Sequence, residues 1–442
     1  MQSTARRNHE LSLLLLALIV GLGAVALAAL ARSMDRLSAA TPLMVLIAFV
    51  YIAAHVVVRK IAPQADHLIL PLVAILNAVG LAAIYRLDPE GFGATQVVWT
   101  AFGVALFVAT LLFFRDYRVL ARYKYILGFA GVGLLLLPMT PLGETINGAR
   151  LWIQIGSFQF QPGELAKVAL VIFFAAYLAE RKELLAVATR RVLGIHIPDI
   201  KHFGPLLVMW GLSLAVMFYE KDLGSSLLFF SIFLVMLYMA TGRFVYTAFG
   251  FVLFGAGAFI GYQTFSHVQT RVVVWLDLFS KPRLLGDEGF QLAQSLFALS
   301  TGGLFGTGLG QGRPDLIPAA HTDFIFSVIG EELGLLGTAA ILISFILLIG
   351  RGFRIALEAR SDFGQLLAAG LTTILGIQTF IILAGVTRLL PLTGVTLPFM
   401  SYGGSSLLSN FILIALLVRI SDQTAREPGP ADTAEILVGG RR

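Results

Sequence analysis

Asp323 is the residue of this chain whose position best suits acid–base chemistry. It ends the segment Pro318–Asp323 and directly precedes the apolar run FIFSVIGEELGLLG. A carboxylate between water and an apolar run can be partly buried, and burial raises its pKa toward that of a general base. The structural alternative is a helix cap, because Asp is common at that position. Asp315, eight residues earlier, could bring a second carboxylate nearby, and two carboxylates suit sugar chemistry.

A second group of charges stands at the starts of two other apolar runs. Glu164 and Lys167 are three residues apart, so they share one face of a helix and can pair. Either this pair locks the helix, or Lys167 is a cation for an anionic headgroup, with Arg150 of the preceding segment near it. Asp222 precedes Leu-Gly, so it either caps the next helix or contributes to a substrate cavity.

Three further polar or glycine-rich features favour structural roles. Of Glu331 and Glu332, inside the run that follows Asp323, one is expected to pair within the helix bundle. Gly302 to Gly310 is not a phosphate-binding loop, because it lacks the preceding strand, and its glycines are expected to allow close backbone packing. Ser401–Ser406 is a polar turn before the last apolar run.

The elements that must position these residues are membrane-spanning helices. The chain has 442 residues, of which 57% are hydrophobic and 13% charged, about half the charged share of a soluble domain. A β-barrel would alternate apolar and polar residues, whereas runs such as LSLLLLALIVGLGAVALAAL are apolar throughout. No Cys occurs, which excludes disulfides and thiolate chemistry. The formal charge of +6 is attributed to membrane loops and not to nucleic-acid binding.

Twelve apolar runs predict about twelve transmembrane helices. They fall near 12–31, 43–58, 68–85, 97–114, 125–139, 163–179, 205–219, 223–240, 244–262, 324–350, 366–387 and 404–418. With the N-terminus inside, the inner segments hold about twice as many Lys and Arg residues as the outer ones. Both termini are therefore expected in the cytoplasm. The first run lacks a small-residue cleavage site, so it is interpreted as a retained span.

The segments between runs predict three further features. The outer segment 140–162 is expected to be an amphipathic loop, and the long outer segment 263–323 is too apolar for a solvated linker, so we expect it folded against the outer membrane face. The polar tail 421–442 is expected to be a disordered cytoplasmic end. No inverted repeat between halves is evident.

Five segments, in order along the chain, resemble the SEDS family (shape, elongation, division and sporulation) of RodA and FtsW proteins, which are polytopic peptidoglycan glycosyltransferases. They are NGARLWIQIGSFQFQPGELAK (147–167), KDLGSS (221–226), FQLAQSLFALSTGGLFGTGLGQG (290–312), AHTDFIFSVIGEELG (320–334) and PLTGVTLPFMSYGGSS (391–406). This chain departs from the family pattern with Glu220-Lys221-Asp222 where Gln-Pro-Asp is frequent, and with Gly163 where Ser is common. The variants FYEKDLG and GVTRLLP resemble the actinobacterial RodA-type branch, which implies side-wall elongation and not division.

The resemblance implies a division of the chain. Residues 1–66 would form the N-terminal end and two helices added to the family's ten-helix core. Residues 67–420 would form the polymerase core, with the large extracytoplasmic loop 263–323 before its last three helices, and residues 421–442 the tail. The implied fold is thus an all-α polytopic membrane protein of about twelve helices.

The resemblance also implies roles for single residues. Asp323 matches the family's essential outer-face carboxylate, Asp315 a second acidic position, and Lys167 and Arg150 its basic positions. Asp323 would then be the general base of an inverting transfer that polymerises lipid II on the outer face of the cytoplasmic membrane. We assign the following residues to substrate binding: Arg150, Glu164, Lys167, Asp222, Arg271, Asp315 and Ser405.

Several alternatives stay open on the sequence alone. A lipid II flippase or transporter would carry ionisable residues near mid-bilayer, whereas here they lie mostly toward the outer interface. A division-type FtsW polymerase and a scaffold that only recruits a partner are the others. The resemblance implies a class B penicillin-binding protein transpeptidase as partner, besides lipid II and membrane lipid, with no nucleic acid. Mg²⁺ or Mn²⁺ could assist, although no cluster of ligands defines a site.

Overall fold

The computed structural model describes residues 2–146, 149–156, 158–186, 190–192, 195–197, 204–220, 222–280 and 286–427. Its helices are α1 (Gln2–Leu30), α2 (Met34–Ile61), α3 (Ile69–Leu87), α4 (Ala94–Phe113), α5 (Val119–Arg122), α6 (Lys124–Leu136), α7 (Pro162–Ala186), α8 (Gly204–Tyr219), α9 (Leu223–Thr241), α10 (Phe244–Thr264), α11 (Ser266–Leu276), α13 (Asp287–Gly302), α14 (Ile325–Glu358), α15 (Asp362–Val386) and α16 (Gly404–Arg426). Short helical turns lie at Pro89–Gly93, Leu137–Met139 and Pro314–Leu316.

The predicted helical membrane fold is confirmed. In the part of the chain that the structure describes, ten helices are long and apolar enough to cross a membrane, and two shorter apolar helices lie at Lys124–Met139 and Gly204–Tyr219. These positions correspond to the twelve apolar runs of the sequence. Whether the two shorter helices also span the membrane stays a prediction.

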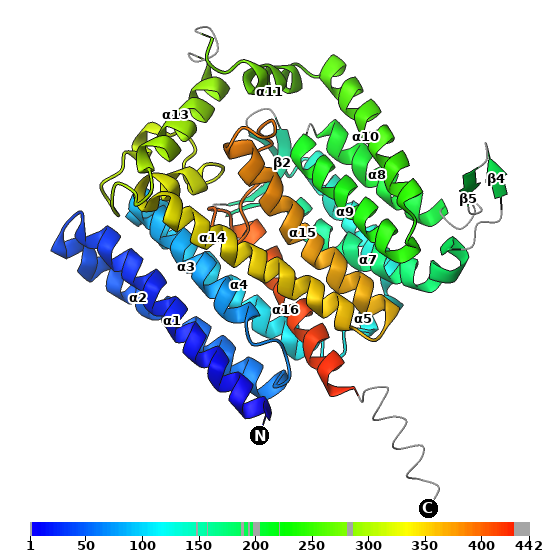
Figure 1. The fold of residues 1–442 in the computed structure, drawn as a ribbon, viewed down its shortest axis with the longest axis horizontal. Coiled ribbons are helices and arrows are strands. Elements are labelled where there is room, and N and C mark those ends of the chain that lie inside the picture. The colour runs from blue at the N-terminus through cyan, green and yellow to red at the C-terminus, as the bar shows by residue number, and fades with distance from the viewer. Residues whose placement is uncertain are drawn as a thin grey trace, which may run out of the picture.

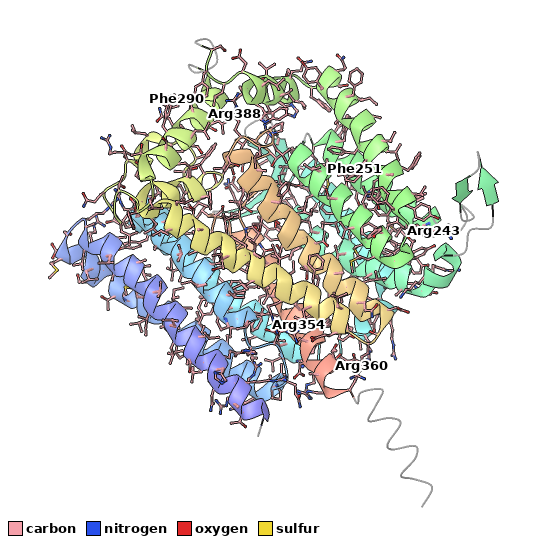
Figure 2. The ribbon with its side chains drawn as sticks, in the orientation of Figure 1. Arg243, Phe251, Phe290, Arg354, Arg360 and Arg388 are labelled. Atoms are coloured by element: carbon pink, nitrogen blue, oxygen red, sulfur yellow. The ribbon has the colours of Figure 1, made fainter. Side chains whose placement is uncertain are left out.

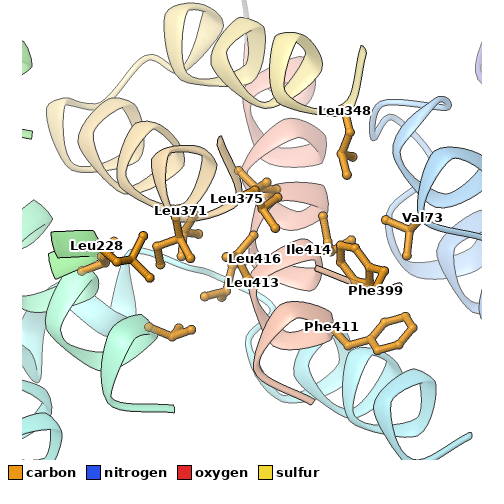
Figure 3. Close-up of a cluster of buried hydrophobic side chains, with 14 of the residues drawn as sticks. Val73, Leu228, Leu348, Leu371, Leu375, Phe399, Phe411, Leu413, Ile414 and Leu416 are labelled. Atoms are coloured by element: carbon orange, nitrogen blue, oxygen red, sulfur yellow. The ribbon is translucent and has the colours of Figure 1, made fainter. Parts of the chain in front are cut away.

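The long helices lie side by side in one bundle (Figure 1). In α7, α15 and α16, 78% of the most apolar window is buried inside the protein, whereas in α10 only 11% is. Helices α7, α15 and α16 therefore lie at the centre of the bundle, while α10 lies at its periphery. Figure 3 shows Leu371 and Leu375 of α15 facing Leu413 and Ile414 of α16, with Phe399 beside them.

The two ends of the bundle carry different residues. In Figure 2, Arg354 and Arg360 lie at one end, and Phe290 and Arg388 lie at the opposite end. The N-terminus and the end of α16 lie at the end that carries Arg354 and Arg360 (Figure 1). The predicted cytoplasmic placement of both termini stays a prediction.

Two segments that the sequence places between apolar runs contain regular structure. The segment expected to be an amphipathic loop forms an antiparallel sheet of β1 (Gly143–Ile146), β2 (Ala149–Ile155) and β3 (Phe158–Phe160). The segment 263–323 contains α11 and α13, in agreement with the expectation that it is folded. A second small sheet pairs β4 (Arg190–Val192) with β5 (Ile195–Ile197).

The last helix continues beyond its predicted end. α16 reaches Arg426, so the first residues of the predicted disordered tail are helical, and residues 428–442 lie outside the described part. The helix is longer because this polar segment contains Asp422, which makes buried contacts that the sequence does not indicate. Asp422 is fully buried, accepts a hydrogen bond from the Gln64 amide at 2.9 Å, and lies 2.8 Å from the Arg426 guanidinium.

Candidate active site

Asp323 lies two residues before α14, where the chain enters the bundle. Its side chain is only partly buried, and Oδ2 faces Gly394: a Cβ added to Gly394 would fall 3.7 Å from this oxygen and 3.9 Å from a terminal nitrogen of Arg271. Burial raises the pKa of the Asp323 carboxyl to about 6, and Arg271 opposes this shift. A carboxylate that titrates near 6 is suited to accept a proton at neutral pH.

The helix-cap alternative for Asp323 does not describe this geometry. The residue preceding α14 is Phe324, and no side chain caps the helix. By contrast, Asp222 caps α9, because its Oδ1 accepts the Ser225 amide at 2.9 Å. The capping interpretation is therefore confirmed for Asp222.

The loop between α15 and α16 (residues 391–403) contacts the chain segment that carries Asp323. The Ser401 hydroxyl donates to the carbonyl of Thr322 at 2.6 Å, and the Tyr402 amide donates to the carbonyl of His321 at 2.8 Å. The His321 ring stacks on Phe92 with centroids 4.1 Å apart, which indicates a structural role for this histidine. The 391–403 loop thus holds the segment that carries Asp323.

Helices from several parts of the chain hold the 391–403 loop itself. Arg271 of α11 donates to the Thr393 carbonyl at 3.2 Å, and Gln96 of α4 donates to that of Ser401 at 3.2 Å. Within the loop, Phe399 has a φ of +64°, a left-handed conformation that costs about 1–3 kcal/mol in a residue other than Gly. Such a conformation persists only where the surrounding structure holds it. The hydrogen bonds from Arg271 and Gln96 contribute to holding this loop.

Glu164 and Lys167 form the predicted ion pair. Their charged atoms are 2.8 Å apart on α7, and both side chains are buried. Lys167 also donates to Oε1 of Gln378 at 3.1 Å, and Glu164 accepts from the Ser409 hydroxyl at 3.1 Å. Gln378 in turn donates to the Thr396 carbonyl at 2.8 Å. The pair is therefore connected to the 391–403 loop, so its structural interpretation has direct support, and a role toward substrate stays a prediction.

Asp222 lies close to this ion pair. The charges of Glu164 and Lys167 both act on its carboxyl, whose pKa is raised mainly by burial. Asp222 also lines a narrow pocket together with Gln161, Glu220 and Ser225. The role of Asp222 toward substrate stays a prediction.

The other predicted substrate-binding residues are placed differently. Arg150 is exposed on β2 and donates to the Thr140 carbonyl at 2.8 Å. Ser405 is buried, and its hydroxyl accepts the Gln161 amide at 2.8 Å. The charges acting on Asp315 are those of Arg313 and Arg86, whereas Arg271 acts on Asp323, so the two carboxylates do not form a pair among the described residues. Their roles toward substrate stay predictions.

Arg86 and the 302–312 segment form a contact that sequence reasoning missed in part. Glu332 lies 3.3 Å from Nε of Arg86 in α3 and accepts the Gly310 amide at 3.0 Å. A Cβ at Gly306 would fall 2.1 Å from the Glu332 carbonyl oxygen. The predictions that one of the two glutamates pairs in the bundle and that the glycines allow close packing are confirmed. The sequence did not single out Arg86 as the partner of this glutamate.

Gln378 is a second residue that sequence reasoning missed. It is fully buried in the middle of α15 and connects Lys167 to the 391–403 loop. A single amide inside the apolar run 366–387 is costly in lipid, and this was the signal that could have identified it.

A divalent cation finds no evident ligand set in this site. Among the described residues, no group of three or more His, Asp or Glu side chains could hold a metal ion. The charged neighbour of Asp323 is a guanidinium, which would repel a cation. We therefore derive no step through a metal.

Ten membrane-length helices in the described part of the chain, and a half-buried carboxylate just before one of them, define a multi-pass membrane protein with a polar site at one end of a helix. The FtsW, RodA and SpoVE family model, described as "Cell cycle protein", matches residues 58–426. This chain belongs to that family, as its sequence motifs indicated.

Relatives with curated names support the RodA branch. The peptidoglycan glycosyltransferase RodA of Mycobacterium leprae is 45% identical over 98% of this chain and 94% of its own length. The protein of that name from Mycobacterium tuberculosis is 48% identical over 85% of this chain and 82% of its own. A probable peptidoglycan glycosyltransferase FtsW of a Geobacter species is 34% identical over 80% of this chain and 96% of its own. The higher identity to the RodA proteins agrees with the predicted branch.

Solved structures show the same fold. One, described as structural coordination of polymerization and crosslinking by a peptidoglycan synthase complex, superimposes with a TM-score of 0.65 at 25% identity, over 82% of this chain and 99% of the other. The Rod shape determining protein RodA of Thermus thermophilus gives a TM-score of 0.56 at 27% identity, over 82% of this chain and 98% of its own.

Proposed function

We propose that this protein is a peptidoglycan glycosyltransferase of the RodA kind that polymerises lipid II into glycan strands, with Asp323 as the general base. The observation that carries the proposal is the partly buried Asp323 carboxylate beside Arg271 and Gly394 at the start of a membrane-length helix. The names of the RodA relatives support the reaction class. The elongation role rests on the same relatives.

The reaction needs a base at the outer interface and cations nearby. Asp323 accepts the proton of the 4-hydroxyl of the acceptor sugar. That oxygen attacks the anomeric carbon of the donor strand, the bond to undecaprenyl pyrophosphate breaks, and the configuration inverts. Arg271 is placed to offset negative charge that develops on the departing pyrophosphate, which is the main electrostatic demand of the step. Arg150 and Lys167 are assigned the same task.

Location and partners follow from this reaction. The active site lies on the extracytoplasmic face of the bacterial cytoplasmic membrane, and both termini are cytoplasmic. A class B penicillin-binding protein crosslinks the product strands. Support comes from the similar structure described as a synthase complex for polymerization and crosslinking.

The direct test is polymerisation of labelled lipid II by the purified protein, alone and with its candidate transpeptidase. We expect glycan ladders from the wild type and none from Asp323→Asn, because the amide has the shape of the acid and cannot accept the proton. Glu90→Gln is the matched control, since it makes the same change on an exposed carboxylate. Ladders from Asp323→Asn would refute the assignment of the base.

The flippase alternative is tested in the same preparation. Proteoliposomes with fluorescent lipid II report movement across the bilayer independently of polymerisation. Lipid movement without glycan ladders, even with the transpeptidase present, would replace the polymerase proposal by the transporter. Ladders without lipid movement support the polymerase.

A further inference from the structure

All of the α1–α2 hairpin except the last four residues of α2 lies outside the family model, which begins at residue 58. The solved relatives align over nearly their whole lengths but over only 82% of this chain. The Mycobacterium leprae relative, by contrast, aligns over 98% of it, so its alignment includes the hairpin. This chain shares the hairpin with that relative, and the contacts of the hairpin indicate what it adds to the common core.

Both ends of the hairpin are tied to the core. At one end, the buried Arg7 donates to the Ala65 carbonyl and pairs with Glu10, which also contacts His55 at 2.6 Å. At the other end, Arg32 donates to the Arg86 carbonyl at 2.8 Å. A hairpin fixed by buried charges at one end and by an exposed hydrogen bond at the other is an integral part of the bundle.

A third contact, midway along the hairpin, leads toward the candidate active site. Tyr51 of α2 is fully buried, and its hydroxyl donates to Oδ1 of Asn77 in α3 at 3.1 Å. The amide nitrogen of Asn77 donates in turn to the carbonyl of Phe399 at 3.1 Å. Asn77 is also fully buried. The hairpin thus reaches the 391–403 loop through one amide side chain.

The Asn77 amide connects the Tyr51 hydroxyl to the Phe399 carbonyl. An amide has a donor end and an acceptor end, and a carbonyl can only accept, so the Phe399 carbonyl holds the donor end of Asn77 toward the loop. The Tyr51 hydroxyl donates to the acceptor end and thereby anchors the amide to α2. Without the hydroxyl, Oδ1 of Asn77 is left buried without this partner, which weakens the support that Asn77 gives to the Phe399 carbonyl.

We infer that Tyr51 is a positioning residue, through which the α1–α2 hairpin holds the 391–403 loop, and with it Asp323, in the active arrangement. Phe399 has left-handed backbone geometry, so its carbonyl needs a fixed partner to stay in place. Two residues later, Ser401 donates to the Thr322 carbonyl next to Asp323. The catalytic consequence of this inference rests on the proposed function, whereas the structural consequence does not.

The test is Tyr51→Phe in the full chain, followed by hydrogen–deuterium exchange of the 391–403 loop. The change removes only the hydroxyl, so the packing of the ring is kept. We expect the amides of Met400 and Ser401, which are bonded to the Leu397 carbonyl, to exchange about tenfold faster, the size expected for one buried hydrogen bond. We also expect kcat for lipid II polymerisation to fall about tenfold with KM unchanged.

Two further variants make the outcome specific. Tyr123→Phe removes a hydroxyl from an exposed tyrosine and should leave exchange and turnover at wild-type values. In an Asn77→Ala background, Tyr51→Phe should change neither, because the path is already broken. Wild-type exchange of the loop in Tyr51→Phe would overturn the inference. Failure of the wild type to polymerise lipid II would refute the proposed function instead, and the exchange result would still decide the inference.

Discussion

At the scale of single residues, the buried ion pair of Glu164 and Lys167 poses the sharpest question. The pair has hydrogen-bond partners on both sides, so it has a structural role whether or not it meets substrate. Removing one member of a buried pair costs about 3–5 kcal/mol, because the other charge is left uncompensated. Removing both together is far less costly. This difference in stability between single and double variants can distinguish a structural role of the pair from a role in substrate binding.

We predict that Lys167→Met lowers both stability and activity, and that Glu164→Gln/Lys167→Met recovers stability alone. The reason is that the double variant leaves no unpaired charge yet lacks the cation assigned to the pyrophosphate. Thermal unfolding in detergent and lipid II polymerisation measure the two effects separately. Activity restored together with stability would show that the pair is purely structural.

The pH dependence of the reaction is a second prediction at this scale. The base must be ionised to act, and the pKa of Asp323 is raised to about 6, so kcat/KM should fall as the pH drops through about 6. Arg271 lowers this pKa, so Arg271→Gln should move the acid limb to higher pH. An acid limb near the ordinary Asp value would contradict the assignment.

The same shift makes a stability prediction. An acid whose folded pKa is raised binds its proton more tightly when folded, so the carboxylate destabilises the protein once the pH rises above the ordinary value. Asp323→Asn should therefore be more stable than the wild type above pH 6, by about 1 kcal/mol after allowance for partial exposure. The advantage should disappear as the pH falls toward 4. Unfolding temperatures across this range measure it.

At the scale of elements, the contact between the 302–312 segment and α14 is the most constrained feature. Gly334 interrupts α14 with a φ of +64°, and the carbonyls of the buried residues Glu331 and Glu332 accept the amides of Thr307 and Gly308 at 2.9 and 3.0 Å. The 302–312 segment therefore supplies hydrogen-bond donors where the helix is interrupted.

Gly306→Ala should break this contact. The new Cβ would meet the Glu332 backbone at a left-handed position, so we expect a loss of about 3 kcal/mol or more. Gly242 is the matched control: its backbone is left-handed α, with φ +65° and ψ +11°, but a Cβ there meets open space, so Gly242→Ala should cost only about 1 kcal/mol. Equal decreases in unfolding temperature for the two variants, relative to the wild type, would contradict this explanation.

Sequence patterns predicted elements better than the contacts between them. Apolar runs placed the helices because lipid demands continuous apolar surface, and the position of Asp323 before such a run already suggested a partly buried carboxylate. The sheet at Gly143–Phe160 was not predicted, because its short strands carry no clear alternation. Nor were Gln378 and Asn77, since the partner of a buried amide depends on packing between distant segments.

At the scale of the whole molecule, the predicted topology can be tested with few changes, because the chain contains no Cys. A single Leu142→Cys change lies in the exposed turn before β1, and Tyr123→Cys lies in the exposed connection between α5 and α6. In intact cells, a membrane-impermeant maleimide should label the first and not the second. Labelling of Tyr123→Cys alone would invert the topology.

The interruption of α14 also affects how the protein is made. The 302–312 segment leaves the ribosome before α14, yet its amides bond to carbonyls that only α14 supplies. During synthesis these amides must stay hydrated at the membrane surface until the later helix has been inserted. Closure of this contact is therefore a late event in biogenesis, and the chain segment around Asp323 acquires its final shape only after α14 is in place.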